Sequence, residues 1–137
     1  MMAPFEAEVM PQADAISDLT EKVMEYLAAQ GVDARATHHV GLALDELLVN
    51  LGSHGGAADR AASVRIVVES DKVRAEVRDT GAEFDIRKAA DPVLTDSIEE
   101  RDIGGLGLFL IRQFASEIGY ERRGGVNCTT FAVLRAA

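Results

Sequence analysis

The chain has 137 residues, of which 47% are hydrophobic and 27% are charged, a composition typical of one globular domain with a sizeable core. Its 14 basic and 23 acidic residues give a formal net charge of −9, which argues against sequence-independent nucleic-acid binding because that needs a basic surface. No apolar run approaches membrane-spanning length, and no basic segment followed by a hydrophobic stretch begins the chain. With a single cysteine, Cys128, these features favour a cytoplasmic protein that has no membrane partner.

The first half of the chain predicts a strand and two helices. Residues 5–9 form the candidate strand, and an amphipathic helix follows that ends near Gln30-Gly31, where glycine is a natural stop. A second helix has Asp33 or Thr37 as its candidate N-cap and stops near Gly55-Gly56. The apolar residues at helical spacing are Ile16, Leu19, Val23, Tyr26 and Leu27 in the first helix, and Val40, Leu44, Leu47 and Leu51 in the second.

The second half predicts a hairpin, an irregular segment, a helix and a second hairpin. Apolar alternation marks strands over 64–68 and 73–77, joined by a turn at Ser70-Asp71. The pattern collapses from Ala82 to about Ile103, which is typical of a functional lid or of disorder. A third helix carries Leu108, Ile111, Phe114, Ala115 and Ile118, and strands over 119–123 and 128–134 close the chain, with Cys128 expected as a small core residue. Antiparallel hairpins with three helices free to cover one face indicate an α+β two-layer sandwich.

Two polar residues interrupt the apolar pattern of the second predicted helix. Glu46 and Asn50 are four residues apart, so they lie on a common helix face about 6 Å apart along the axis. Asn50 offers the kind of neutral oxygen that Mg²⁺ accepts beside substrate phosphates, and Glu46 could orient or deprotonate an attacking hydroxyl. The plain alternative is that both face solvent on an ordinary amphipathic helix, because this spacing is common by chance.

Two glycine-containing segments complete the set of candidates. Asp79-Thr80-Gly81 follows a strand and is either a simple turn or a place where a carboxylate and a close backbone approach could receive a base. Gly104, Gly105 and Gly107 are expected just before the third helix, whose free N–H groups favour anions, although a plain helix entry explains them as well. The chain has neither a Walker A motif nor a dinucleotide fingerprint.

The order and spacing of these segments resemble a known superfamily. Glu46-x-x-x-Asn50, Asp79-x-Gly81-x-x-Phe84-Asp85 and Gly104-Gly105-x-Gly107-Leu108 are similar to the three nucleotide boxes of the GHKL (histidine-kinase-like) ATPases. The resemblance extends from about Ala13 to Leu134 and is greatest to the bacterial anti-sigma factor serine/threonine kinases. It implies one Bergerat-type ATP-binding domain over 1–137, with a mixed, mainly antiparallel sheet and an ATP lid at about 82–104.

The resemblance also implies a role for each matching residue. Glu46 corresponds to the catalytic base, Asn50 to the Mg²⁺ ligand and Asp79 to the adenine-binding aspartate. The remaining positions expected at ATP are Gly81, Arg101, Gly104, Gly105, Gly107 and Leu108, of which Arg101 lies where such kinases often place a basic residue near phosphate or partner. Position 83 departs from many superfamily members, because it is Glu where they have a second glycine.

The function implied is that of an ATP- and Mg²⁺-dependent kinase in a partner-switching system. Such a protein sequesters a sigma factor or similar target and phosphorylates a serine or threonine of an antagonist protein, and its relatives often form homodimers. Two alternatives remain open. A catalytically weak partner-binding scaffold of the same fold is favoured by the seven carboxylates between positions 83 and 102. A stand-alone histidine-kinase catalytic domain is the other.

Two basic pairs are expected to have no role in the site. Adjacent His38 and His39 point to different faces of a helix, and no further ligand completes a metal set, so both are interpreted as solvated. Arg122 and Arg123 are interpreted as a solvated pair in a turn.

Overall fold

The computed structural model describes residues 3–53, 59–88 and 103–136. The elements follow one another in the predicted order. They are β1 (Phe5–Val9), α1 (Ala13–Ala29), α2 (Ala34–Ser53), β2 (Ala62–Val68), β3 (Lys72–Asp79), the 3-10 helix η1 (Ile86–Lys88), α3 (Ile103–Phe114), β4 (Glu117–Arg123) and β5 (Val126–Leu134).

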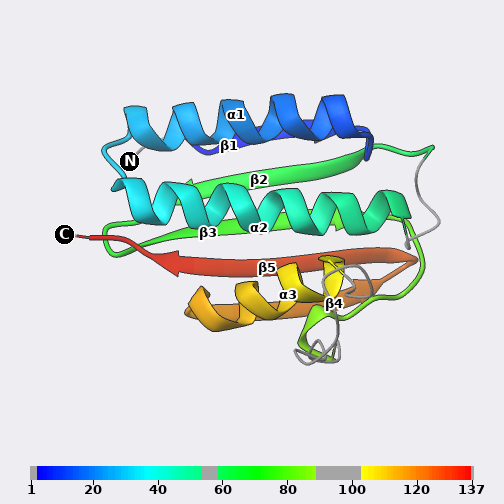
Figure 1. The fold of residues 1–137 in the computed structure, drawn as a ribbon. Coiled ribbons are helices and arrows are strands. Elements are labelled where there is room, and N and C mark those ends of the chain that lie inside the picture. The colour runs from blue at the N-terminus through cyan, green and yellow to red at the C-terminus, as the bar shows by residue number, and fades with distance from the viewer. Residues whose placement is uncertain (1–2, 54–58, 89–102, 137) are drawn as a thin grey trace.

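The five strands form one open sheet in the order β1-β2-β3-β5-β4, and each of the four pairings is antiparallel. Figure 1 shows α1, α2 and α3 side by side on one face of this sheet. The predicted α+β two-layer sandwich is therefore confirmed, with a sheet that is antiparallel throughout its described strands. Among the described helices, none is long and apolar enough to cross a membrane.

Local contacts explain where the first two helices end and begin. The chain leaves α1 through Gly31, whose φ of +80° is a conformation that glycine adopts without strain. Asp33 then caps α2, because its Oδ2 accepts a hydrogen bond from the Ala36 N–H at 3.1 Å. Of the two candidate caps Asp33 is thus the correct one, since Thr37 lies inside the helix.

The third helix is shorter than predicted. It ends at Phe114, and the Ser116 N–H donates to Ala132 O at 2.9 Å, which directs the chain into β4. Ile118 belongs to that strand and pairs with Phe131. The prediction that Ile118 continues the helix was wrong because its apolar side chain packs on the core equally well at the two-residue period of a strand.

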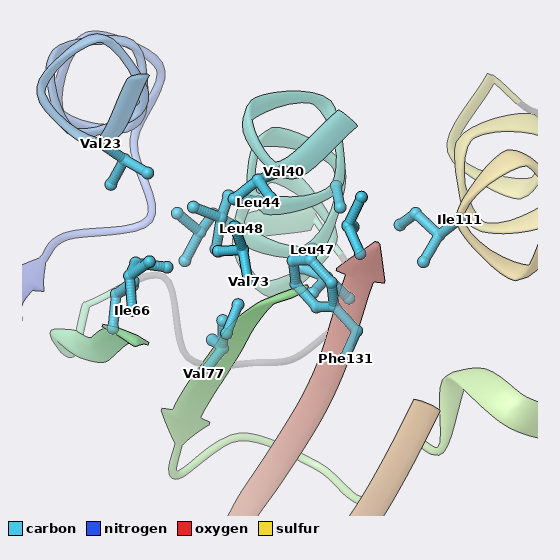
Figure 2. Close-up of a cluster of buried hydrophobic side chains, with 14 of the residues drawn as sticks. Val23, Val40, Leu44, Leu47, Leu48, Ile66, Val73, Val77, Ile111 and Phe131 are labelled. Carbon is cyan, nitrogen blue, oxygen red and sulfur yellow. The ribbon is translucent and has the colours of Figure 1, made fainter. Parts of the chain in front are cut away.

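The core lies between the helices and the covered face of the sheet. Figure 2 shows side chains from all three helices directed toward β2, β3 and β5. Those labelled there are Val23, Val40, Leu44, Leu47, Leu48, Ile66, Val73, Val77, Ile111 and Phe131. All ten are buried, and they hold α2, the central helix, in a fixed position over β3 and β5.

Cys128 is not a core residue, contrary to the prediction. It is half-buried, and its Sγ donates to Glu76 Oε1 at 2.9 Å. Glu76 belongs to the uncovered face of the sheet, where the outward residues of β3 lie. The strand pattern was read correctly, but Asn127 and Thr129 occupy the covered face, so the residue between them must point the other way.

Candidate nucleotide site

A hollow lies between the C-terminal half of α2 and the covered face of the sheet, and contains about 470 Å³ of space including its open mouth. Its apolar walls come from α2, from β3 and from the segment after β3, and are formed by Leu47, Leu51, Val77, Ala82, Phe84 and Ile86. Three polar residues complete it: Asn50, Asp79 and Thr129. Mainly apolar walls with a few convergent polar groups are the usual form of a small-molecule site.

Asp79 supplies a buried carboxyl group to this site. It is the last residue of β3, on the face that Val73 and Val77 bury, and only 6% of it is exposed. Its Oδ1 accepts hydrogen bonds from the Gly81 N–H at 2.9 Å and from Asn127 Nδ2 at 3.0 Å. Among the described residues both bonds to the carboxylate end on Oδ1, so Oδ2 remains able to accept from a ligand.

Asn127 was not foreseen in the sequence, although it hydrogen-bonds the Asp79 carboxylate directly. It is 2% exposed, and its Nδ2 reaches Asp79 Oδ1, Ala82 O at 2.9 Å and Gly81 O at 3.3 Å. The available signal was its position: in β5 it alternates with Thr129 and Phe131 on the covered face, where an amide needs hydrogen-bond partners.

On α2, Asn50 lines the hollow and Glu46 precedes it by one turn. Asn50 is 9% exposed, and its Nδ2 donates to Glu46 O at 2.7 Å. Because this bond engages the amide nitrogen, the amide oxygen is the atom left for a ligand, which suits a hard cation such as Mg²⁺. Glu46 is partly exposed on the same helix. The plain alternative, in which both residues face solvent, is wrong for Asn50.

The glycine run lies differently from its prediction. Gly104, Gly105 and Gly107 are within the first two turns of α3, which begins at Ile103, and not before it. Leu108 is 3% exposed and belongs to the hydrophobic core, so its side chain anchors α3. Arg101, the predicted phosphate contact, lies outside the described residues.

The predicted lid, 82–104, is described only at its two ends, over 82–88 and at 103–104, where α3 begins. Ala82 and Phe84 line the hollow, and Ile86 is buried both in its wall and in the core. The Asp85 carboxylate then pairs with Arg87, whose Nη2 lies 2.8 Å from Oδ2, and this hydrogen bond holds the pKa of Asp85 below its usual value. The described start of the predicted lid is therefore anchored, and positions 89–102 lie outside the described residues.

One member of each basic pair set aside in the sequence makes a tertiary contact, while His38, Arg122 and Arg123 are exposed as predicted. Arg122 lies in β4, and its Nη1 donates to Gly81 O at 3.0 Å and to Asn127 Oδ1 at 2.8 Å. His39 stacks on Phe114 of α3 with ring centroids 4.3 Å apart and planes within 3°. Burial lowers the pKa of His39, the largest of several causes. Both contacts join segments distant in sequence, which adjacent-residue reasoning does not detect.

Comparison with known proteins agrees with this geometry. The family model for the histidine kinase-like ATPase domain matches residues 9–133. The chain therefore belongs to the histidine kinase-like ATPase domain family.

Two individual proteins are similar to this chain. The chain is 32% identical over 99 residues to the serine/threonine-protein kinase BtrW of Bordetella bronchiseptica, covering 71% of this chain and 70% of that protein. It also shares its fold with part of the solved chain that holds the RsbU and RsbW domains of Rv1364c from Mycobacterium tuberculosis, with a TM-score of 0.70 at 20% identity. That match covers 99% of this chain, which spans 34% of the solved chain. The predicted resemblance to the histidine-kinase-like ATPases is confirmed, and the similarity to BtrW agrees with the expected serine/threonine kinase branch.

Proposed function

We propose that this protein is an ATP-dependent serine/threonine protein kinase of the anti-sigma factor type. It binds Mg²⁺ and ATP, sequesters a sigma factor or equivalent regulatory target, and phosphorylates a serine or threonine of an antagonist protein. The observation that carries the nucleotide part is a buried carboxylate, Asp79, in an apolar hollow that Asn50 also lines. The similarity to a serine/threonine-protein kinase supports the choice of reaction.

The hollow fits the adenine end of ATP. Its apolar walls suit a flat aromatic base, and Asp79 Oδ2 is an acceptor for the exocyclic amino group. Gly81 is buried beside it and has no side chain to hold a base away from the backbone. The site therefore combines shape with one directional hydrogen bond.

The phosphate end would lie toward α2 and the start of α3. Asn50 would hold Mg²⁺ through its amide oxygen, and the metal, when bound, neutralises charge on the phosphate oxygens. The backbone N–H groups at the start of α3, where the three glycines lie, favour phosphate. Glu46 would accept, on its carboxylate, the proton of the attacking serine or threonine hydroxyl.

Calorimetric titration with ATP tests the nucleotide site directly. Wild-type protein should bind ATP in a magnesium-dependent manner, and Asn50→Ala should lose that dependence because the amide oxygen is gone. Asp45→Ala is the matched control, since Asp45 also lies on α2 but lines a groove with α1 residues. Absence of ATP binding by the wild-type protein would refute the proposal.

Phosphoryl transfer tests the assignment of the base. With an antagonist protein and radiolabelled ATP, Glu46→Ala should keep nucleotide binding and lose transfer by about a hundredfold or more, whereas Asp45→Ala should transfer normally. Transfer by Glu46→Ala at the wild-type rate would remove Glu46 from this role.

The two alternatives give different results in the same assay. A partner-binding scaffold, which the acidic residues between 83 and 102 favour, would capture a target protein without any transfer. A histidine-kinase catalytic domain would yield an acid-labile phosphoprotein, because phosphohistidine hydrolyses in acid and phosphoserine does not.

A further inference from the structure

We infer that Asn127 is the positioning residue that makes this site selective for an adenine base, an inference that rests on the proposed function. It acts through Asp79, by holding one carboxylate oxygen so that the other is presented to the base as a fixed acceptor. None of the three nucleotide boxes contains this residue. It lies 48 positions beyond Asp79 in the sequence, on β5.

The orientation of the Asn127 amide is determined by its surroundings. Its Oδ1 accepts from the Tyr120 hydroxyl and from Arg122 Nη1, the latter at 2.8 Å. The Arg122 guanidinium can only donate, so the oxygen must face it and the NH₂ group must face the opposite side. On that side lie only acceptors among the described contacts, Asp79 Oδ1 at 3.0 Å and Ala82 O at 2.9 Å being the nearest.

The same amide fixes the backbone that follows Asp79. Gly81 O accepts from both Asn127 Nδ2 and Arg122 Nη1, and Ala82, whose carbonyl Asn127 also binds, lines the hollow. On the other side of the turn, Arg60 Nη1 donates to Thr80 O at 3.2 Å. The wall beside the carboxylate is therefore held from β5 and β4 and from the residues before β2.

A carboxylate held in this way distinguishes purines by the group at position 6. The 6-amino group of adenine donates a hydrogen bond to Asp79 Oδ2, whereas the 6-oxo group of hypoxanthine presents a second acceptor and is repelled. A site built around one such bond rejects the analogue that cannot make it, here by about a hundredfold in affinity. Without the Asn127 donor the carboxylate loses its fixed orientation and half of its observed hydrogen bonds.

The test is the ratio of ATP to ITP affinity in Asn127→Asp, measured by calorimetry at about pH 6 beside the wild-type protein. The substitution keeps the shape of the side chain but replaces the N–H donor beside Asp79 Oδ1 by an oxygen, so the hydrogen bond that fixes the carboxylate is lost. We expect the preference for ATP to fall about tenfold or more, a change that loss of packing alone does not produce.

Glu121→Gln is the matched control, because Glu121 lies on the same hairpin, is exposed and pairs with Arg123. Its ATP to ITP ratio should equal that of the wild-type protein. A wild-type ratio in folded Asn127→Asp would overturn the inference and leave the proposed function intact, whereas lack of ATP binding by the wild-type protein would refute both.

A second variant decides the matter if thermal unfolding shows that Asn127→Asp does not fold. The double substitution Tyr120→Phe, Arg122→Leu keeps Asn127 but removes the two donors that orient its amide. The amide can then turn its oxygen toward Asp79, so the ATP preference should fall several-fold. An unchanged ratio in this variant would overturn the inference.

Discussion

Both faces of the sheet carry carboxylate side chains, but a carboxylate on the covered face is buried and one on the uncovered face forms ion pairs. On β3, Asp79 is 6% exposed under the helices, while Glu76, three residues earlier, is on the uncovered face and pairs with Arg78 at 2.9 Å. The Cys128 thiol, followed by Arg78, holds the pKa of Glu76 below its usual value. Glu76 has charged partners beside it, whereas Asp79 depends on amide and backbone donors.

This difference teaches how the site can be recognised. Charges on the uncovered face form ion pairs between neighbouring strands, such as Arg65 with Glu6 at 3.2 Å, and contribute little because water screens them. A polar residue on the covered face must be satisfied by the protein or used by a ligand. Asp79 and Thr129 are such residues, Asn50 of α2 is buried over the same face, and all three line the hollow.

The largest expected effect contrasts two neighbours on β2. Ile66 is fully buried on the covered face and Arg65 is exposed on the other. Ile66→Ala should lower the free energy of unfolding by about 2–5 kcal/mol through lost burial and a residual cavity, and Arg65→Ala by about 1 kcal/mol or less. Urea denaturation measures both. Equal losses would contradict the assignment of the core to one face.

The next effect compares two carboxylates of β3 in nucleotide binding. Asp79→Asn removes the charge that accepts from the adenine amino group, so ATP affinity should fall about 10- to 100-fold. Glu76→Gln, on the uncovered face, should bind ATP as the wild-type protein does. If calorimetry gave the two variants the same affinity, the base would bind elsewhere.

A smaller effect concerns the reactivity of Cys128 on the uncovered face. Burial, followed by the hydrogen bond to Glu76, raises the pKa of its thiol to about 11. Only about one thiol in a thousand is then ionised at pH 8, so alkylation by iodoacetamide should be slow. Glu76→Gln should increase the rate several-fold by removing the nearby charge, with the variant Arg65→Ala as control. Rapid alkylation of the wild-type protein would show a different environment.

The smallest effect tests the contact between α2 and α3. Because burial lowers the pKa of His39, the unfolded chain binds a proton more readily than the folded protein. The contribution of the buried, neutral His39 to the free energy of unfolding should be complete above the unfolded pKa of about 6.5. It should decrease as the pH falls from there toward the folded pKa. Denaturation midpoints of wild type and His39→Gln between pH 7.5 and 5.5 measure it.

The pH window isolates His39 from the carboxylates. Several carboxylates have lowered pKa values, so their contributions to the free energy of unfolding are lost only at lower pH, where they take up protons. They are Asp33, Glu76, Asp85 and Glu117. His38→Gln is the matched control, since His38 is exposed. Identical pH dependence in His39→Gln and the wild-type protein would contradict the stacking on Phe114.

Much of the fold followed from periodicity. Every predicted strand and helix exists, because alternation and helical spacing report directly which residues face a core. One error concerned Ile118, whose position fits both the spacing of a helix and the alternation of a strand. The other concerned Cys128, because the partner strand decides which face of the sheet its side chain occupies. Asp79 and Asn50 were predicted as site residues, and both line the hollow because they lie at positions of β3 and α2 that point inward.

By itself the sequence determined the order of the elements and the covered and uncovered residues of most strands. It also placed Asp79 and Asn50 within its motifs. Only the tertiary structure decided that Asn127, Tyr120 and Arg122 orient Asp79, that His39 meets Phe114, and that Leu108 serves the core. The physical reason is that periodicity encodes burial along one segment. Hydrogen bonds between β3 and β5, 48 residues apart, depend on the register in which the strands meet.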